Sequence, residues 1–317
     1  MSELWSGMLF QLAQLLLVVL LAPLVQGWVD QCRAWLQNRS GAGVLQPYRN
    51  LRKLFHKDAV LAADASPLFR GAPYILFSCM WLAAGIIPVI ATDLPYSPAA
   101  DVIALVGIFA LARMFIALAA MDIGTAFGTL GARREMLVSF LAEPALLMVF
   151  FDVSLISHST QLTHIVETLA HREFVLYPSL AFASVAFVMV LLAENARIPV
   201  DNPATHLELT MIHEAMTLEY SARYLALVEW ASSLKLLTYI SIGIALFVPF
   251  GIAEVGNWAG LPLGVATLAV KLAAAGAGLA LLETVLAKMR IFRVPEFLGA
   301  AFLLAVLGLL IHFLLGA

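Results

Sequence analysis

Eight long apolar runs divide this sequence, and they constrain its fold more than any other feature. Each run has about 20 residues or more, enough to cross the hydrocarbon core of a bilayer as a helix. Because lipid offers no partner to backbone N–H and C=O groups, a crossing segment has to be helical. The sequence therefore predicts an all-α polytopic membrane protein with eight transmembrane helices, at about 4–30, 69–92, 99–121, 137–158, 175–195, 222–250, 261–287 and 295–316.

Charge is scarce along the whole chain. Charged residues make up 12% of the 317 residues, against roughly 25% in a soluble domain. No polar stretch is long enough to fold separately, so we expect a single membrane domain over residues 1–317. No basic residue precedes the first run, where Glu3 is the only charge, and the run has no small-residue cleavage motif, which predicts a retained helix and not a cleaved signal.

The basic residues predict the orientation. Fourteen of the 18 Lys and Arg residues fall in the connections after the first, third, fifth and seventh runs or within two residues of them, whereas Arg172 is alone in the opposite connections. Basic connections stay on the cytoplasmic side of a membrane. We therefore expect cytoplasmic loops at 31–68, 122–136, 196–221 and 288–294, and both termini outside.

Two of these cytoplasmic loops carry patterned residues. In the first, Leu51, Leu54 and Phe55 recur at helical spacing among basic residues, which predicts a short amphipathic helix in the headgroup layer. An ordinary interfacial anchor has the same pattern. The other is an acidic stretch over 193–221, in which Pro199 and Pro203 predict an irregular first half and 204–220 can be helical.

Among the charged residues that fall within or at the ends of the apolar runs, we single out nine. Charged side chains at this depth cost at least ~2.5–3.5 kcal/mol each and tend to mark pathways through the protein. Glu143 and Asp152 lie nine residues apart, on opposite faces of one helix. We predict a buried polar cluster toward the cytoplasmic half of the fourth, fifth and sixth runs, either as contacts between helices or as a proton-accessible channel. The nine are Arg113, Asp122, Glu143, Asp152, Glu194, Glu229, Lys235, Lys271 and Glu283.

Other kinds of site find little support. His206 and His213 are seven residues apart, whereas a helical HExxH-type metal site needs four. Cys32 and Cys79 form no CxxC pair, so this chain cannot hold an iron–sulfur cluster by itself. No catalytic triad or phosphate loop is present, and nothing indicates nucleic-acid binding. We expect no catalytic residue, metal or cofactor in this chain.

Three segments resemble one known family, in order and on the predicted cytoplasmic side. They make the chain similar to subunit 1 of respiratory complex I and, more closely, to the membrane subunit of complex-I-related nickel–iron hydrogenases of the formate hydrogenlyase type. The segments are Leu45 to Tyr48 with Lys53 to Phe55, Lys57 and Asp58; Asp122 to Gly124 with Gly131 to Glu135, Glu143 and Pro144; and Ala193, Glu194, Arg197, Pro199, Asp201, Glu208, Leu209, Glu219 and Tyr220, followed by Glu229, Trp230 and Lys235.

The resemblance implies a coupling subunit in a bacterial or archaeal cytoplasmic membrane. Its expected partners are the hydrogenase large and small subunits, an iron–sulfur subunit and antiporter-like membrane subunits, with the nickel–iron centre and the iron–sulfur clusters in those partners. A proton channel would use Glu143, Glu194, Glu208, Glu219, Glu229, Asp152 and Lys235. A loop surface that docks the electron-transfer arm and shapes a cavity would use Gln46, Pro47, Tyr48, Lys53, Asp122, Arg134, Arg197, Asp201, His206 and His213.

The chain also departs from the complex I pattern. Ala204 and His206 stand where complex I has glutamates, and Gly41, Ala42 and Gly43 replace its Gly-Pro-Gly. These departures favour the hydrogenase branch over a complex I subunit with a quinone pocket, which stays an alternative. A stand-alone secondary transporter would show inverted repeats and broken helices, which the sequence lacks. The nine charges argue against a pure anchor.

Overall fold

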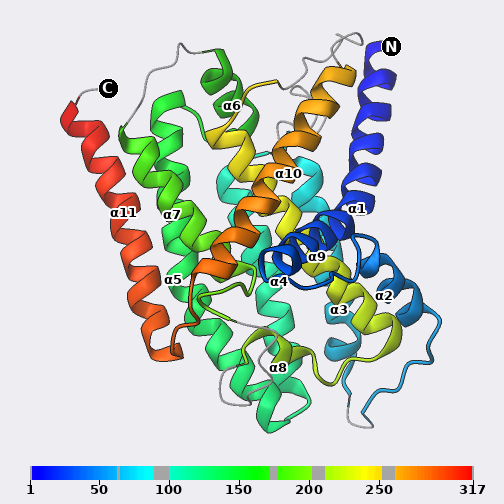
Figure 1. Cartoon of the computed structure of the whole chain (residues 1–317). Helices are drawn as coiled ribbons and strands as arrows, with labels where there is room; N and C mark the ends of the chain where they lie inside the picture. Colours follow the sequence, from blue (N-terminus) through cyan, green and yellow to red (C-terminus); the bar gives the residue numbers. More distant parts are fainter. Residues whose placement is uncertain are drawn as a thin grey trace.

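The computed structural model describes residues 2–62, 65–88, 100–171, 178–201, 211–251 and 261–315. These residues form a bundle in which most of the long helices run between two opposite ends of the molecule (Figure 1). Its helices are α1 (Ser2–Leu36), α2 (Gln46–Phe55), α3 (Pro67–Ile86), α4 (Val102–Asp122), α5 (Ala126–Ser157), α6 (Leu162–His171), α7 (Pro178–Glu194), α8 (His213–Thr217), α9 (Ala222–Phe247), α10 (Leu261–Val285) and α11 (Val294–Leu315), with a 3-10 turn, η2 (Ile291–Arg293), before α11.

The predicted all-α membrane fold is confirmed. Within the described residues, seven helical segments are long and apolar enough to cross a bilayer, in α1, α3, α4, α5, α9, α10 and α11. The remaining predicted span, 175–195, corresponds to α7, which is equally apolar but has only 17 residues. The amphipathic helix predicted in the first loop is α2, whose Leu51 and Leu54 are buried against Ala226 of α9.

The largest difference from the prediction lies in the connection 122–136, which is mostly helix. Gly124, at φ +71°, turns the chain after α4, and Thr125 caps α5 by accepting the N–H of Gly128 at 3.3 Å. With 32 residues, α5 is about 48 Å long, so one end extends beyond a 30 Å hydrocarbon core. The charged residues of 122–136 predict a loop outside the bilayer. The part of a helix that extends beyond the bilayer can carry the same charged residues. The short α6 was also not predicted.

The packing order places α9 at the centre and α11 at the edge. In the apolar window of α9 67% of the residues are buried, against 22% in the window that covers α11. α9 packs on α1, α3 and α7, whereas α11 packs on α5 and α7. Polar side chains in the middle of α9, such as Thr238 and Ser241, are therefore buried against other helices.

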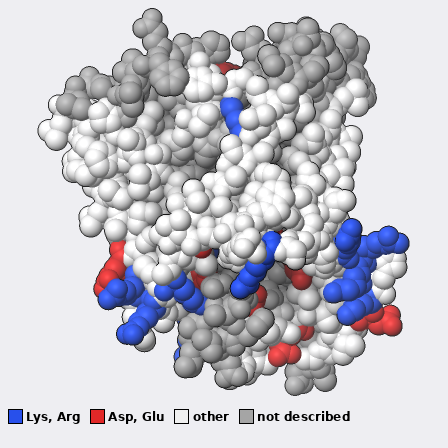
Figure 2. Space-filling view, viewed as in Figure 1, with Lys and Arg blue, Asp and Glu red and all other residues white. Residues whose placement is uncertain are grey.

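Charge separates toward one end of the molecule. Lys, Arg, Asp and Glu gather below a broad uncharged belt in Figure 2, at the end where α2 and α8 lie. The first turn of α1 and the last turn of α11 both lie at the opposite end (Figure 1). This arrangement has the polarity that the distribution of Lys and Arg predicts.

The bend in α1 brings polar residues over the bundle. Pro23 lies inside this helix, and proline removes a backbone hydrogen bond and bends a helix. In Figure 1 the second part of α1 turns away from the direction of the first. Trp28, in that second part, donates its indole N–H to the carbonyl of Ala273 on α10 at 2.9 Å.

Candidate functional site

Four charged side chains from four helices meet inside the bundle, and we call them the membrane cluster: Arg113 of α4, Glu143 of α5, Glu194 of α7 and Lys235 of α9. Arg113 Nη2 lies 2.9 Å from Glu143 Oε1, and its Nη1 donates to Glu194 Oε1. Lys235 Nζ lies 3.0 Å from Glu194 Oε2. Two cations and two carboxylates balance, which is how buried charge is tolerated.

Glu194 is the centre of this cluster. It is the last residue of α7, its side chain is 1% exposed, and each of its oxygens faces a different cation. A carboxylate so placed responds to any change of charge on its neighbours, because a low-dielectric interior screens charge weakly. The cluster is therefore an electrostatically coupled unit and not four separate residues.

Aromatic side chains close the cluster toward the end of the molecule where the termini lie. Tyr239 stands one turn after Lys235 on α9, and its ring stacks on Phe109 of α4 with centroids 4.9 Å apart. The ring of Phe187 on α7 packs near the same tyrosine ring, with centroids 6.3 Å apart. All three are fully buried. In the described part of the chain, this aromatic layer separates the membrane cluster from the outer half of the bundle.

Glu143 is the partly exposed member of the membrane cluster. Its side chain is 31% exposed, and Phe140, one turn earlier on α5, is 78% exposed. A carboxylate facing hydrocarbon is unfavourable, so ionisable groups at this depth face protein or water. Glu143 is therefore the member of the membrane cluster with the most access to the surface of this chain.

A second group, the loop cluster, lies near the end of α5 that extends from the bundle: Glu135 of α5, Asp201, His213 of α8 and Lys288. His213 Nε2 is 3.3 Å from Glu135 Oε2, and its Nδ1 is 3.7 Å from Asp201 Oδ2. Burial acts to lower the pKa of His213, but the charges of Glu135 and Asp201 outweigh it, so the pKa is raised above its ordinary value.

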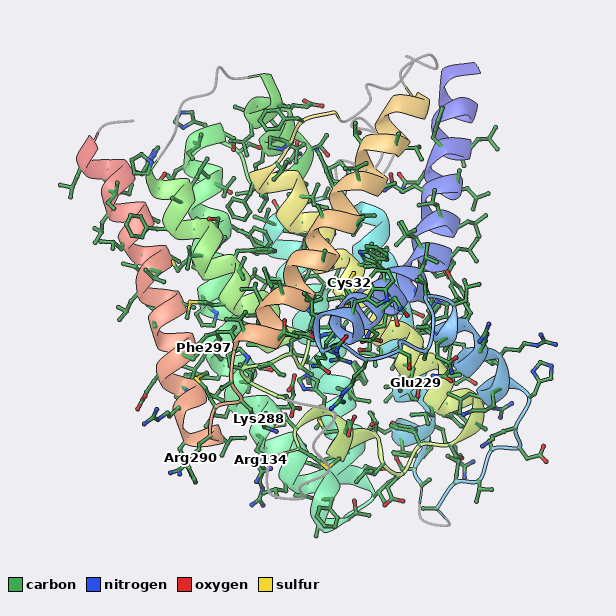
Figure 3. The ribbon with its side chains drawn as sticks, viewed as in Figure 1. Cys32, Arg134, Glu229, Lys288, Arg290 and Phe297 are labelled. Carbon is green, nitrogen blue, oxygen red and sulfur yellow. The ribbon has the colours of Figure 1, made fainter. Side chains whose placement is uncertain are left out.

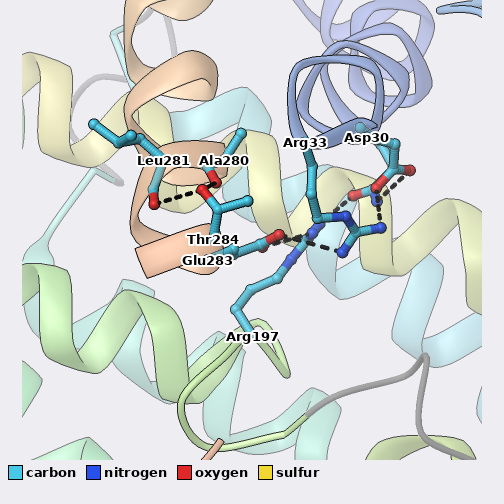
Figure 4. Close-up of polar contacts among 8 residues, drawn as sticks. Asp30, Arg33, Arg197, Ala280, Leu281, Glu283 and Thr284 are labelled. Carbon is cyan, nitrogen blue, oxygen red and sulfur yellow. Dashed lines mark hydrogen bonds and ion pairs between the residues drawn. The ribbon is translucent and has the colours of Figure 1, made fainter. Parts of the chain in front are cut away.

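A third group joins α1 to α10, and we call it the α1–α10 cluster: Gln26, Asp30, Arg33, Arg197 and Glu283 (Figure 4). Glu283 is 3% exposed and pairs with Arg197 at 2.9 Å and with Arg33 at 3.3 Å. Arg197 also donates to Gln26 Oε1 at 2.5 Å. The cluster holds the start of the acidic stretch against two helices.

The structure brings together only part of the predicted channel. Glu143, Glu194 and Lys235 meet, but Asp152 does not join them. It is fully buried on the opposite face of α5, next to α11. A Cβ added to Gly308 of α11 would lie 3.0 Å from Oδ2 of Asp152. Glu219 is exposed. Glu229 is exposed on α9, within electrostatic range of Lys53 on α2 (Figure 3).

Two predicted residues, His206 and Glu208, lie outside the described residues.

The predicted docking residues divide into two sets. Those of α5 and the acidic stretch hold the protein itself together: Arg134 donates to the carbonyl of Met211 at 3.0 Å, and Asp201 accepts the N–H groups of Ile212 and His213, each at 3.3 Å. Lys53 and Asp122 are exposed and available to a partner.

Residues of the first loop contact α1 or each other. Tyr48 donates its hydroxyl to the carbonyl of Leu20, and the ring of Pro47 approaches the position that a Cβ on Gly27 would take. Gln46 donates to Asn50 at 3.1 Å. These three residues fix the loop in place and contribute little free surface.

Sequence reasoning missed several residues of these clusters. Arg113 and Glu283 were recognised as charges at membrane depth but given no role, and their partners come from distant helices. Glu135 lies in a segment that its charges predict to be a loop, so the sequence assigns it no role, whereas the structure places it in α5. Among the described residues, no group of three or more His, Cys, Asp or Glu side chains could hold a metal ion.

Comparison with known proteins identifies the family of this chain. The family model described as NADH dehydrogenase matches residues 10–314, nearly the whole chain. The chain belongs to this family. It is 31% identical to formate hydrogenlyase subunit 4 of Escherichia coli (strain K12) over 296 residues, which is 93% of this chain and 95% of that protein. It is also 35% identical to hydrogenase-4 component C of the same organism over 247 residues, 78% and 77% of the two chains.

Among solved structures, one chain of a membrane-bound sulfane sulfur reductase, described as an archaeal respiratory membrane complex, has the same fold. Its TM-score is 0.82 over 96% of this chain and 98% of that one, at 17% identity. The family member described here is thus a multi-pass membrane protein, homologous to named subunits of formate hydrogenlyase and hydrogenase-4.

Proposed function

We propose that the chain is the coupling membrane subunit of a membrane-bound nickel–iron hydrogenase complex of the formate hydrogenlyase type. Its place would be a bacterial or archaeal cytoplasmic membrane, with both termini outside. Its partners would be the hydrogenase large and small subunits, an iron–sulfur subunit and antiporter-like membrane subunits. The nickel–iron centre and iron–sulfur clusters would belong to those partners, so the chemistry of this chain is confined to charge and protons.

The membrane cluster is the observation that carries the proposal. It joins three of the carboxylate and amine groups predicted for the ion path, Glu143, Glu194 and Lys235, through Arg113. The aromatic layer of Phe109, Phe187 and Tyr239 opposes a direct path to the outer side. Since Glu143 keeps a lateral exposure, a change of charge or a proton would pass sideways to a neighbouring subunit.

Docking of the peripheral arm is supported by the way the two loops join. Ser221, at the end of the acidic stretch, accepts the N–H of Val60 in the first loop at 2.9 Å. Tyr220 donates its hydroxyl to the carbonyl of Phe69 at 3.0 Å, and the two rings stack with centroids 4.1 Å apart. The two loops thus form one surface, and the exposed Lys53 and Asp122 would contact the arm.

Replacing Glu143 by Gln tests the ion path. The variant Glu143→Gln removes one carboxylate from the membrane cluster with almost no change in volume. We expect hydrogen oxidation with a soluble dye, which needs only the peripheral arm, to continue, while coupled movement of H⁺ or Na⁺ into membrane vesicles is lost. The matched control is Glu296→Gln, which removes an exposed carboxylate at the start of α11. Ion movement in Glu143→Gln equal to that of the control would overturn the proposal.

The family itself favours one second candidate, a quinone-reducing complex, because its description is NADH dehydrogenase. The partners separate the two candidates. A co-purifying large subunit with two CxxC pairs for nickel and iron supports the hydrogenase, and inhibition by quinone-site compounds supports the quinone reductase.

A further inference from the structure

His213 occupies an unusual position for a histidine on a short surface helix. It is the first residue of α8, and its side chain is 26% exposed. One ring nitrogen faces Glu135 at 3.3 Å and the other faces Asp201 at 3.7 Å. Two carboxylates on opposite sides of one imidazole favour its protonated form. Histidine is also the side chain whose ordinary pKa lies nearest to physiological pH.

The surrounding backbone holds His213 in this position. Asp201 accepts the N–H groups of Ile212 and His213 at 3.3 Å. α8 also packs directly on α5, since a Cβ on Gly131 would lie 2.8 Å from the carbonyl oxygen of Ile212 and 2.9 Å from the side chain of Ala215. The imidazole therefore meets Glu135 through fixed contacts between α5 and the acidic stretch.

Glu135 links this position to the membrane cluster. It lies eight residues before Glu143 on α5, about 12 Å along the helix axis. It acts electrostatically on both Arg113 and Glu143, and His213 does so on Glu194. Because Glu135 is 2% exposed, a change in its charge is screened weakly and reaches the cluster.

We propose that His213 and Glu135 form the proton-binding site at the cytoplasmic entrance of the ion path, a role that rests on the proposed function. The neutral imidazole takes a proton from the loop side at Nδ1 and becomes imidazolium, which then passes the proton on Nε2 to Glu135 Oε2, 3.3 Å away. The step breaks one N–H bond, forms one O–H bond, and turns a charged pair into two neutral groups. Arg113 and Glu143 then lose the negative charge of Glu135, which shifts the balance of the membrane cluster.

The charged groups around the imidazole come from each element that packs on it. Glu135 belongs to α5, Asp201 to the segment after α7, and Lys235 of α9 acts in the opposite sense. Lys288 lies 3.9 Å from Asp201. The two carboxylates prevail over Lys235, so the pKa of His213 is raised.

A purely structural role, in which His213 only attaches α8 to α5, predicts different results. We would compare His213→Gln, Glu135→Gln and Gly131→Ala in the assembled complex. The first two remove a proton-binding group, whereas Gly131→Ala disturbs the packing of α8 but retains both ionisable side chains. The readout is ion movement per hydrogen oxidised, measured across pH in membrane vesicles.

We expect His213→Gln and Glu135→Gln to lower this ratio by about tenfold or more and to abolish its dependence on pH near neutrality. Gly131→Ala should lower the ratio without changing the shape of its pH profile. If all three variants keep the wild-type pH profile, or if Gly131→Ala alters it as the other two do, the proton-binding role is wrong.

A second readout separates this inference from the proposed function. A raised pKa in the folded state stabilises the protein below the unfolded value of about 6.5, and the contribution fades as pH rises through the folded value. The thermal midpoint of the wild type should therefore exceed that of His213→Gln most at acid pH and least at alkaline pH. This difference supports proton binding even if Glu143→Gln keeps ion movement and the proposed function fails; a difference independent of pH overturns it.

Discussion

Glu194 shows at the residue scale how this family member keeps charge inside a membrane. Its two oxygens are shared between Arg113 and Lys235, and Arg113 in turn holds Glu143. Removing one member of such a group leaves a partner buried without compensation, which costs more than the intact pairs contribute. The membrane cluster is therefore stable only as a whole, so a change at one member is felt by the others.

The variant Arg113→Met tests this dependence. It leaves Lys235 to balance two carboxylates, and we expect it to destabilise the folded chain by about 3–5 kcal/mol. The matched control is Arg133→Met, which removes an exposed arginine from α5. Thermal unfolding of the purified protein in detergent measures both. Equal midpoints for the two variants would show that the buried pairs contribute little to stability.

At the scale of the elements, the ends of the helices define the site. α5 runs past the bilayer and carries Glu135 to α8, while the bend in α1 places Asp30 and Arg33 over the end of α10 (Figure 4). The length of α5 and the bend in α1 each bring a charged side chain of a largely apolar helix to the acidic stretch. The loop cluster and the α1–α10 cluster then fasten the two ends of the 195–213 segment.

Gly27 provides a prediction at this scale. A Cβ on this residue would lie 2.0 Å from the carbonyl oxygen of Val44, so Gly27→Ala must push the first loop away from α1. We expect a loss of about 1–3 kcal/mol and faster proteolysis of the first loop. Gly107→Ala on α4 is the control, because nothing lies within 4 Å of its added Cβ; there we expect a gain of up to about 1 kcal/mol. Similar losses in both would disprove the close contact.

At the scale of the whole molecule, charge segregation determines orientation. Lys288 and Arg290 lie at the same end as Arg134 (Figure 3), whereas the first turn of α1 and the last turn of α11 lie at the other end (Figure 1). Because basic side chains resist translocation, we propose that this end is cytoplasmic. The proposed docking surface, the loop cluster and the α1–α10 cluster lie at that end, which is the end that a cytoplasmic arm would contact.

Cysteine labelling tests this orientation. In a background of Cys32→Ser and Cys79→Ala, we would introduce Lys57→Cys, Arg290→Cys or His164→Cys, all at exposed positions. A membrane-impermeant maleimide should label only position 164, on α6, in right-side-out vesicles, and positions 57 and 290 only in inverted vesicles. Labelling of 57 or 290 from outside would contradict the proposed orientation.

Some of this molecule could be predicted because the governing property is local. The length of an apolar run predicts a spanning helix, and the alternation of Leu51, Leu54 and basic residues predicts α2, whichever helices lie nearby. Periodicity alone separated Glu143 from Asp152, and the structure places them on opposite faces of α5. The extent of α5 was harder to predict, since a charged segment outside the bilayer is equally compatible with a loop and with a helix.

The sequence by itself thus determined an all-α membrane protein and the end of the molecule at which charged residues gather. Only the tertiary structure decided how those residues pair. Glu194 meets Arg113 from 81 residues away, Glu283 meets Arg33 and Arg197 instead of joining the membrane cluster, and Glu229 stays exposed on the surface of α9. The physical reason is that the rotation of each helix about its axis and the choice of its neighbours follow from packing between distant segments, and no local pattern records them.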